Sequence, residues 1–187
     1  MDLQQAMQAR HSVRSYTEQP IEGKQAEDLR AFVAQCNEES GLHLQLVLNE
    51  PKAFDSFMAH YGKFSGVRNY LVLAGKKGPG LEEACGYYGE KAALYAQTLG
   101  LNTCWVALTY SRGKAVFTLA PGEKLCLVIA LGYGTTQGVP HKSKPREAVM
   151  RCETTPPGWF IRGVEAALLA PTAMNQQKFI FAPGGRP

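Results

Sequence analysis

A cluster of basic and hydroxyl side chains near the start of the sequence could bind an anion. Within five consecutive positions the chain carries Arg10, His11, Ser12 and Arg14. Alternate residues of an extended segment share a face, so Arg10, Ser12 and Arg14 could converge on one anion. A guanidinium offers a planar pair of donors to phosphate oxygens, and serine adds a short donor. The alternative interpretation is a solvated basic turn that follows a helix.

A second basic segment lies in a polar loop near residue 142. Lys142 and Lys144 belong to the stretch from His141 to Arg146, which follows the last strongly apolar run of the sequence. Phosphate sites in α/β proteins lie in loops at strand ends, which favours a binding role. A lysine-rich loop that is only solvated is the alternative. Our joint hypothesis is that the two basic segments close on one phosphate.

A third segment combines small residues, a proline and side-chain amides. It contains Pro171, Thr172, Ala173, Asn175 and Gln177. Its small residues allow the backbone to press against a planar ring, and its amides offer paired donors and acceptors. The alternative is an ordinary turn that ends one helix and leads into a strand.

Familiar catalytic and metal-binding motifs do not occur in the sequence. It has no G-x-S-x-G, no Walker lysine loop, no G-x-G-x-x-G after a strand and no H-E-x-x-H. The four histidines and five cysteines are dispersed, so we expect neither a metal site nor a disulfide framework. A globular domain of this kind is either a binding protein or an enzyme whose chemistry belongs to a cofactor.

Composition limits the class of protein further. The 20 Lys+Arg and 16 Asp+Glu residues give a net charge of +4, too small and too scattered for a dedicated nucleic-acid binder. With 45% hydrophobic residues, the chain is expected to fold as a single domain over residues 1–187. The first ten residues lack the apolar core of a signal peptide, and no apolar run is long enough to span a membrane. Since the scattered cysteines favour a reducing compartment, we expect a cytoplasmic protein that binds neither nucleic acid nor a membrane.

Helix and strand patterns alternate along the chain, which predicts an α/β or α+β fold. Apolar positions three and four residues apart indicate helices, and alternating or continuous apolar runs indicate strands. The expected helices cover residues 2–9, 26–36, 53–61, 82–99 and 159–169, and the expected strands cover 42–48, 70–74, 102–108 and 125–131. Gly86 and Gly89 interrupt the strongest helix, which indicates close approach of another helix or a flat ligand, or simply tight packing.

Two further motifs accompany the three polar segments: LGLNTCWV at residues 99–106 and ALGYG at residues 130–134. In this combination the chain resembles the nitroreductase-like, FMN-dependent oxidoreductases, with matching pieces from residue 7 to residue 179. The resemblance implies an α+β fold with a central, mostly antiparallel sheet flanked by helices. It also implies a homodimer that binds FMN at the subunit interface.

The resemblance assigns contact with FMN to residues throughout the chain. By motif position they are Arg10, His11, Ser12, Arg14, Lys63, Trp105, Val106, Ala107, Leu108, Lys142, Lys144, Pro171, Thr172, Ala173 and Asn175. Residues 10–12 and the two lysines of the later loop are implied to hold the phosphate and ribityl chain. Arg14 and Lys63 are implied to approach the pyrimidine edge, near His60, which occupies a position where the family often has an amide. Residues 105–108 then face the central ring, and residues 171–175 cover the flavin.

Two features depart from the family pattern. The segment around Asn175 follows the first long helix in most members, but here, as in one subgroup, it lies near the C-terminus. Whether it acts in its own subunit or across a dimer is therefore open. Members normally continue through another strand, whereas this sequence ends in glycine and proline after Phe181. We therefore expect a truncated or divergent end after about residue 181.

The function implied by the resemblance is that of an NAD(P)H oxidoreductase in which FMN carries the chemistry and no side chain is catalytic. NADH or NADPH would supply a hydride, which passes to a nitroaromatic, a quinone or a similar electron-poor acceptor. Two alternatives stay open. One is a flavin-binding protein without turnover, for sensing, storage or delivery, and the other is an interaction domain whose basic loops are solvated surface.

Overall fold

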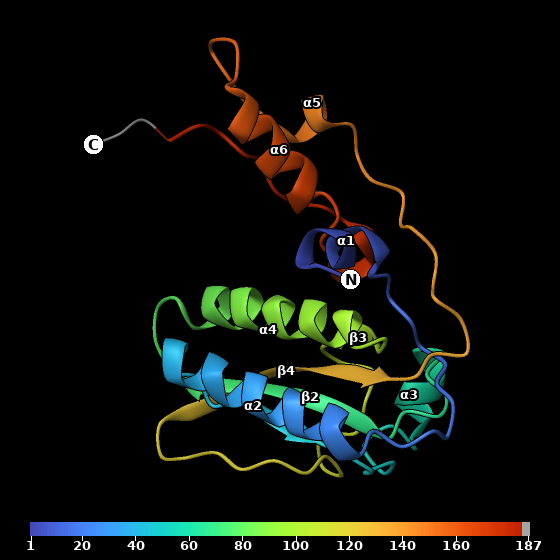
Figure 1. Ribbon diagram of the computed structural model, residues 1–187. Helices are drawn as coiled ribbons and strands as arrows, with labels where there is room; N and C mark the ends of the chain where they lie inside the picture. The colour runs from blue at the N-terminus through green and yellow to red at the C-terminus, as the bar shows by residue number, and fades with distance from the viewer. Residues whose placement is uncertain (185–187) are drawn as a thin grey trace. The chain divides into compact units, whose positions relative to one another are not determined.

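The computed structural model describes residues 1–184, and the chain divides into two compact units, Met1–Gly138 and Val139–Pro187. The first unit carries the sheet and the helices α1 to α4, and the second carries α5, α6 and a short 3₁₀ helix, η1 (Figure 1). In chain order the elements are α1 (Leu3–Ala9), α2 (Gly23–Ser40), β1 (Gln45–Val47), α3 (Phe57–Tyr61), β2 (Asn69–Lys76), α4 (Leu81–Thr98), β3 (Asn102–Val106), β4 (Glu123–Gly132), α5 (Arg146–Val149), α6 (Gly158–Ala167) and η1 (Ala173–Asn175). The expected α+β class is confirmed, and the expectation of a single domain stays a prediction.

The sheet of the first unit contains four strands in the order β1-β2-β4-β3. All three pairings are antiparallel, as the sequence analysis expected. β2 and β4 form the centre, where Asn69 pairs with Leu131 at one end and Lys76 pairs with Glu123 at the other. β3 lies along the outer side of β4 and is therefore an edge strand.

Both faces of the sheet are covered by apolar side chains. Leu71 and Leu73 of β2 pack into a cluster with α2 and α4, which run side by side along this face (Figure 1). Tyr70 and Val72 point to the opposite face and pack with loop residues that include Phe54. Because successive side chains of a strand alternate between faces, a strand covered on both faces must be apolar throughout. This double coverage explains the continuous apolar run at residues 70–74.

Two expected strands are shorter in the structure. The strand expected over 42–48 is reduced to β1, because the Asn37 side chain occupies both backbone groups of Leu44: Leu44 N donates to Asn37 Oδ1 at 2.7 Å, and Asn37 Nδ2 donates to Leu44 O at 2.9 Å. The strand expected over 102–108 ends at Val106, so residues 107 and 108 leave the sheet.

Of the two glycines inside α4, only Gly89 meets a close neighbour. A Cβ atom at Gly89 would lie 2.7 Å from Leu73 Cδ1 and 2.7 Å from Trp105 Cη2, whereas a Cβ atom at Gly86 would point into open space. The groups that approach Gly89 are side chains of the sheet, which agrees with the alternative of simple tight packing.

The second unit has a small core of its own. Val149, Phe160, Val164 and Leu168 are buried against one another. Phe181 forms a parallel bridge with Met150, and its N–H donates to Val149 O at 2.8 Å. The end of the described chain is therefore tied to this unit by an isolated bridge, and residues 185–187, part of the expected divergent end, lie outside the described residues.

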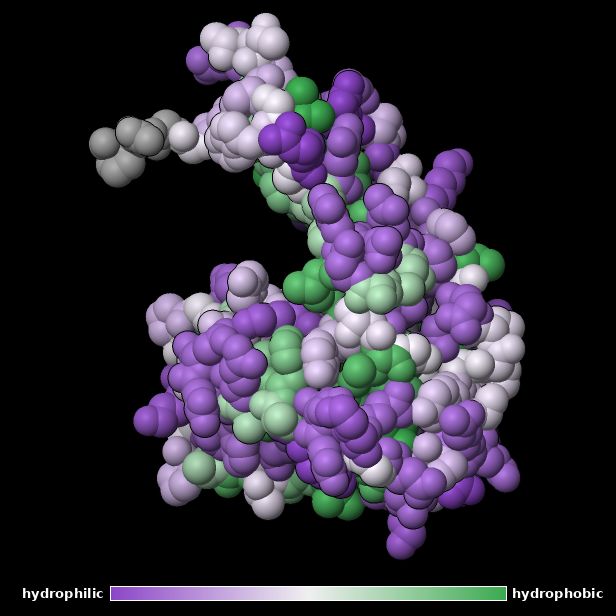
Figure 2. Space-filling view, in the orientation of Figure 1, coloured by the Kyte–Doolittle hydropathy of each residue, from purple (hydrophilic) through white to green (hydrophobic). Residues whose placement is uncertain are grey.

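The outward side of α2 is polar. Its buried residues are Ala26, Leu29, Val33 and Cys36, and the visible face of the first unit around this helix is mostly hydrophilic (Figure 2). Among the helices of residues 1–184, none combines the length and the apolarity needed to cross a bilayer.

Candidate functional site

Backbone contacts place residues 12–16 beside the outer edge of β3 and the turn that precedes β2. Val13 N donates to Thr103 O at 3.0 Å, and Ser65 N donates to Arg14 O at 3.0 Å. The segment therefore runs first beside β3 and then beside the turn that precedes β2.

Two buried groups beside this segment keep their protons. Tyr16 donates its hydroxyl to Val13 O at 2.7 Å, and burial raises the pKa of Tyr16 well above its ordinary value. Burial also raises the pKa of the Cys104 thiol in β3. A neutral phenol is a permanent donor, and a protonated thiol is a poor nucleophile, so both groups serve the packing of the segment.

Arg10 is held by a residue that the sequence analysis did not consider. Its Nε lies 3.0 Å from Glu90 Oε1, and the Arg10 side chain is only 2% exposed. The other oxygen of the same carboxylate, Glu90 Oε2, accepts a hydrogen bond from Trp105 Nε1 at 2.8 Å. Arg10 Nη1 is buried and has no hydrogen-bond partner within residues 1–184. A sequence signal for Glu90 does exist, because its neighbour Gly89 indicated a close approach to this turn of the helix.

Arg14 and Lys63 lie on adjoining segments and are both exposed. The Arg14 guanidinium lies 5.9 Å from the centre of the Phe64 ring, and Lys63 adopts a left-handed backbone with φ of 61°. Neither forms an ion pair with a carboxylate of the described chain. The same turn packs against the segment after β3, since a Cβ atom at Gly62 would lie 2.6 Å from Thr109 Cβ. Arg14 and Lys63, which have no carboxylate partner in residues 1–184, thus lie near the turn that packs against Thr109.

The structure does not bring Arg10, Ser12 and Arg14 together on one anion. Arg10 reaches Glu90 on α4, which packs on one face of the sheet. Arg14 reaches Phe64, which belongs to the cluster on the other face. The two guanidinium groups are therefore available to different parts of an extended ligand.

The segment expected to face a flavin ring is exposed in its second half. Trp105 is half-buried and Val106 is buried, whereas Ala107 is exposed and the Leu108 side chain is 80% exposed. His60, in the last turn of α3, is also exposed, and His11 and Ser12 are half-buried. An exposed apolar side chain thus lies in the segment that packs against the turn of Lys63.

In the second unit, Gln177 joins the basic loop to the amide-rich segment. Its Oε1 accepts from Lys144 N at 2.8 Å, and its Nε2 donates to Lys142 O at 2.9 Å. Asn175 Nδ2 also donates to Lys142 O at 2.9 Å, and Lys144 Nζ donates to Gln177 O at 3.0 Å. The structure therefore brings two of the three predicted segments together. The Lys142 ammonium has no partner within residues 1–184 and is exposed.

The amide-rich segment has an unusual backbone. Met174, Asn175 and Gln177 have φ of 51°, 55° and 47°, a left-handed region that favours glycine. Such conformations cost about 1–2 kcal/mol each and persist where the surroundings hold them, often at ligand sites. Of the remaining residues expected to cover a flavin, Pro171 and Thr172 are half-buried and Ala173 is exposed.

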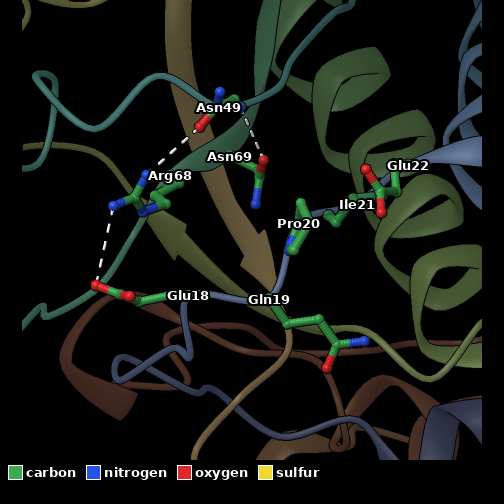
Figure 3. A pocket seen from close by; sticks show the side chains of 8 residues that line it. All are labelled: Glu18, Gln19, Pro20, Ile21, Glu22, Asn49, Arg68 and Asn69. Atoms are coloured by element: carbon green, nitrogen blue, oxygen red, sulfur yellow. Dashed lines mark hydrogen bonds and ion pairs between the residues drawn. The ribbon is translucent and has the colours of Figure 1, made fainter.

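A hollow of about 200 Å³ in the first unit lies apart from the predicted flavin residues (Figure 3). In it, Arg68 lies between Asn49 and Glu18: Nη1 is 3.5 Å from Asn49 Oδ1, and Nη2 is 4.0 Å from Glu18 Oε1. Glu22 adds a second carboxylate to the lining. Because one carboxylate already lies 4.0 Å from the arginine and a second lines the hollow, this hollow does not suit the phosphate of FMN.

The comparison with protein families decides the classification of the chain. Residues 2–186 match the family described as "Putative TM nitroreductase". The chain belongs to this nitroreductase family. No curated protein matches it.

Solved structures of nitroreductases share the fold. A "putative nitroreductase" from Thermotoga maritima superimposes with a TM-score of 0.67 at 22% identity, over 99% of this chain and 73% of the other. A nitroreductase with bound FMN from Bacteroides fragilis gives 0.53 at 21% identity, over 78% and 94% of the two chains. An FMN-dependent nitroreductase from Clostridium difficile gives 0.55 at 16% identity, over 70% and 87%. The nitroreductase-like fold expected from the motifs is therefore confirmed.

The polar groups of this nitroreductase fit FMN as a ligand. FMN combines a phosphate, a polar ribityl chain and a planar ring with an electron-rich pyrimidine edge. In the first unit, Arg14 and Lys63 have no carboxylate partner within residues 1–184, and Arg10 Nη1 is buried without an acceptor there; in the second unit, the Lys142 ammonium has no partner within the same residues. Buried donors are normally satisfied, so the Arg10 group calls for an acceptor from outside the described residues.

Proposed function

We propose that this nitroreductase is an FMN-dependent NAD(P)H oxidoreductase that reduces a nitroaromatic, a quinone or a similar electron-poor acceptor. The observation that carries the proposal is the pair of exposed cations, Arg14 and Lys63, which lack a carboxylate partner in residues 1–184 and lie beside the exposed segment after β3. An uncompensated positive charge at such a place favours a ligand that gains negative charge during the reaction.

The residues divide the work of binding between the two ends of FMN. In the first unit, Arg10 would meet a phosphate oxygen and Ser12 with His11 would contact the ribityl chain. In the second unit, Lys142 and Lys144 are cations suited to a phosphate. Arg14 and Lys63 would hold the pyrimidine edge, where their charge stabilises a developing anion. When bound, FMN supplies the redox chemistry, since it accepts a hydride from NADH or NADPH and returns it to an acceptor.

The remaining segments would exclude water from the ring. In the first unit, residues 105–108 offer backbone groups and the exposed Leu108 side chain. In the second unit, residues 171–175 offer small residues suited to cover a flat ligand. The unusual backbone at Met174 and Asn175 supports this role, because strained segments occur at ligand sites.

We also propose that the protein acts as a cytoplasmic homodimer. Phe57, Tyr61 and Leu108 are exposed apolar side chains of the first unit, and such groups favour contact with a second copy. All five cysteines are free thiols, which supports a reducing compartment. Light scattering after size-exclusion chromatography tests the dimer, and a mass equal to one chain would contradict it.

An absorbance spectrum of the purified protein tests the proposed function. Protein incubated with FMN and desalted is expected to be yellow, with a flavin band at about 450 nm that bleaches anaerobically with NADH or NADPH and returns when a quinone or nitroaromatic is added. FMN that is retained but never bleached would favour a flavin-binding protein without turnover. Colourless protein would contradict both.

Matched variants connect the spectrum to the residues. Arg14→Ala and Lys142→Ala are each expected to weaken FMN binding by about 1.5–3 kcal/mol, the value of a charged hydrogen bond. Lys52→Ala, which removes an exposed cation of the first unit without a side-chain partner in residues 1–184, is the control and should leave affinity unchanged. Equal affinity in all three variants would refute the assignment of these cations.

A further inference from the structure

One carboxylate joins two segments that the proposed function uses for different parts of FMN. Glu90 lies in the middle of α4, forms an ion pair with Arg10 Nε at 3.0 Å and accepts a hydrogen bond from Trp105 Nε1 at 2.8 Å. Each oxygen of the carboxylate serves one partner, Oε1 for Arg10 and Oε2 for Trp105. The helix therefore fixes the segment before Ser12 and the end of β3 through a single side chain.

The shape of α4 supports the same contact. A Cβ atom at Gly89 would lie 2.7 Å from Trp105 Cη2 and 3.3 Å from Trp105 Cζ2, so the indole lies directly against the helix backbone. Only glycine allows this approach without a shift of the indole. The missing side chain of Gly89 thus leaves room for the Trp105 indole, and the hydrogen bond from Trp105 Nε1 to Glu90 orients the ring.

The ion pair with Glu90 leaves one buried N–H group of Arg10 without an acceptor in residues 1–184. The Arg10 side chain is 2% exposed and the Glu90 side chain 23% exposed, so the ion pair is partly shielded from solvent. Glu90 occupies Nε, while Nη1 has no acceptor within residues 1–184. A guanidinium held at Nε cannot turn freely, and its remaining N–H groups keep a fixed direction.

We propose that Glu90 is a positioning residue, which holds Arg10 so that a free N–H of the guanidinium meets a phosphate oxygen of FMN and holds Trp105 so that the segment 105–108 keeps its place. This inference rests on the proposed function. Glu90 itself contacts no ligand in it, and acts only through Arg10 and Trp105.

A purely electrostatic role makes the opposite prediction. The negative charge of Glu90 partly cancels the positive charge of Arg10, so loss of that charge alone would strengthen the binding of an anion. If Glu90 acts by position, loss of the side chain weakens binding, because Arg10 must then be ordered when FMN binds. The sign of the change distinguishes the two roles.

The test compares FMN affinity, measured by quenching of flavin fluorescence, in Glu90→Ala and Glu90→Gln. We expect Glu90→Ala to raise the dissociation constant about 10- to 100-fold, the loss of one well-oriented charged hydrogen bond. Glu90→Gln keeps the length of the side chain and one acceptor oxygen, so it should bind more tightly than Glu90→Ala. The control is Glu39→Gln, which removes a different ion pair to α4, that with Lys91 at 2.6 Å, and should leave affinity unchanged.

A second readout follows Trp105 without FMN. The chain has two tryptophans, Trp105 and Trp159, so a Trp159→Phe background leaves Trp105 as the only indole emitter. Glu90→Ala in this background should make Trp105 emission more accessible to acrylamide quenching, whereas Glu39→Gln should not.

The outcomes separate the two proposals. If the unmodified protein binds no FMN, the proposed function fails, and the ligand role of Glu90 fails with it. If the unmodified protein binds FMN and both Glu90 variants bind it equally well or more tightly, only the positioning role is overturned. If both Glu90 variants bind FMN equally weakly and unfold at a temperature well below that of Glu39→Gln, Glu90 only stabilises the fold. This outcome would also overturn the positioning role.

Discussion

Gln177 offers the sharpest test of how the second unit holds its basic loop. Its side chain is 2% exposed and forms three hydrogen bonds of 2.9 Å or less, with Lys144 N, Lys142 O and Asn175 Oδ1. At about 0.5–1.5 kcal/mol each, their loss in Gln177→Ala should lower the stability of this unit by about 2–4 kcal/mol. Urea unfolding gives this difference, and amide exchange at Lys144, whose N–H loses its acceptor, locates it.

Two neighbouring variants control this experiment. Gln176→Ala removes an exposed amide from the preceding position and should change stability by less than about 0.5 kcal/mol. Gln177→Gly should be at least as stable as Gln177→Ala, because the φ of 47° favours glycine. If Gln177→Ala unfolds like the unmodified protein, with Lys144 N–H still protected, then the side chain does not hold the loop and the reasoning is refuted.

The other predictions concern the first unit. Gly89→Ala should destabilise it by about 1–3 kcal/mol through overpacking against Trp105, whereas Gly86→Ala, which points into open space, should stabilise it by up to about 1 kcal/mol. Thermal unfolding of the pair checks this, and equal effects would contradict the difference in packing. Burial raises the pKa of Tyr70 from 10.0 to about 12, so the folded state keeps this proton after the unfolded chain has lost it. The contribution of the Tyr70 proton to the free energy of unfolding should be full below pH 10 and be lost as the pH rises towards about 12. Tyr70→Phe should remove this contribution to the pH dependence, as measured by urea unfolding across that range.

The long elements could be predicted because their patterns are local. The helix expected over 82–99 is α4, Leu81–Thr98, and the strand expected over 70–74 is the centre of β2, Asn69–Lys76. Helix spacing and a continuous apolar run are properties of neighbouring residues, so no knowledge of the fold is needed. The start of β1 could not be predicted in this way. Leu44 continues the apolar alternation, but its hydrogen bonds to the Asn37 side chain remove it from the strand.

The polar segments could be predicted from the sequence, but the contacts of their side chains could not. The motif at residues 10–14 predicts a polar segment, and the structure places it on the edge of β3. That Arg10 turns towards Glu90 while Arg14 turns towards Phe64 depends on which element covers each face of the sheet. Such coverage is a tertiary property, and the alternating pattern of an isolated segment does not contain it.

The sequence patterns predicted for neither Glu90 nor Gln177 that it holds other residues in place, although Gln177 belongs to the third polar segment. Each has a side chain of a common surface type, and each acts on the position of other residues. Gln176 and Gln177 are consecutive amides with the same chemistry, yet only Gln177 is buried, and the backbone is left-handed at Gln177 and right-handed at Gln176. A motif reports which groups can reach a ligand, whereas the groups that hold them in place follow from packing. Substitution of these two residues therefore tests the arrangement of the proposed site separately from its chemistry.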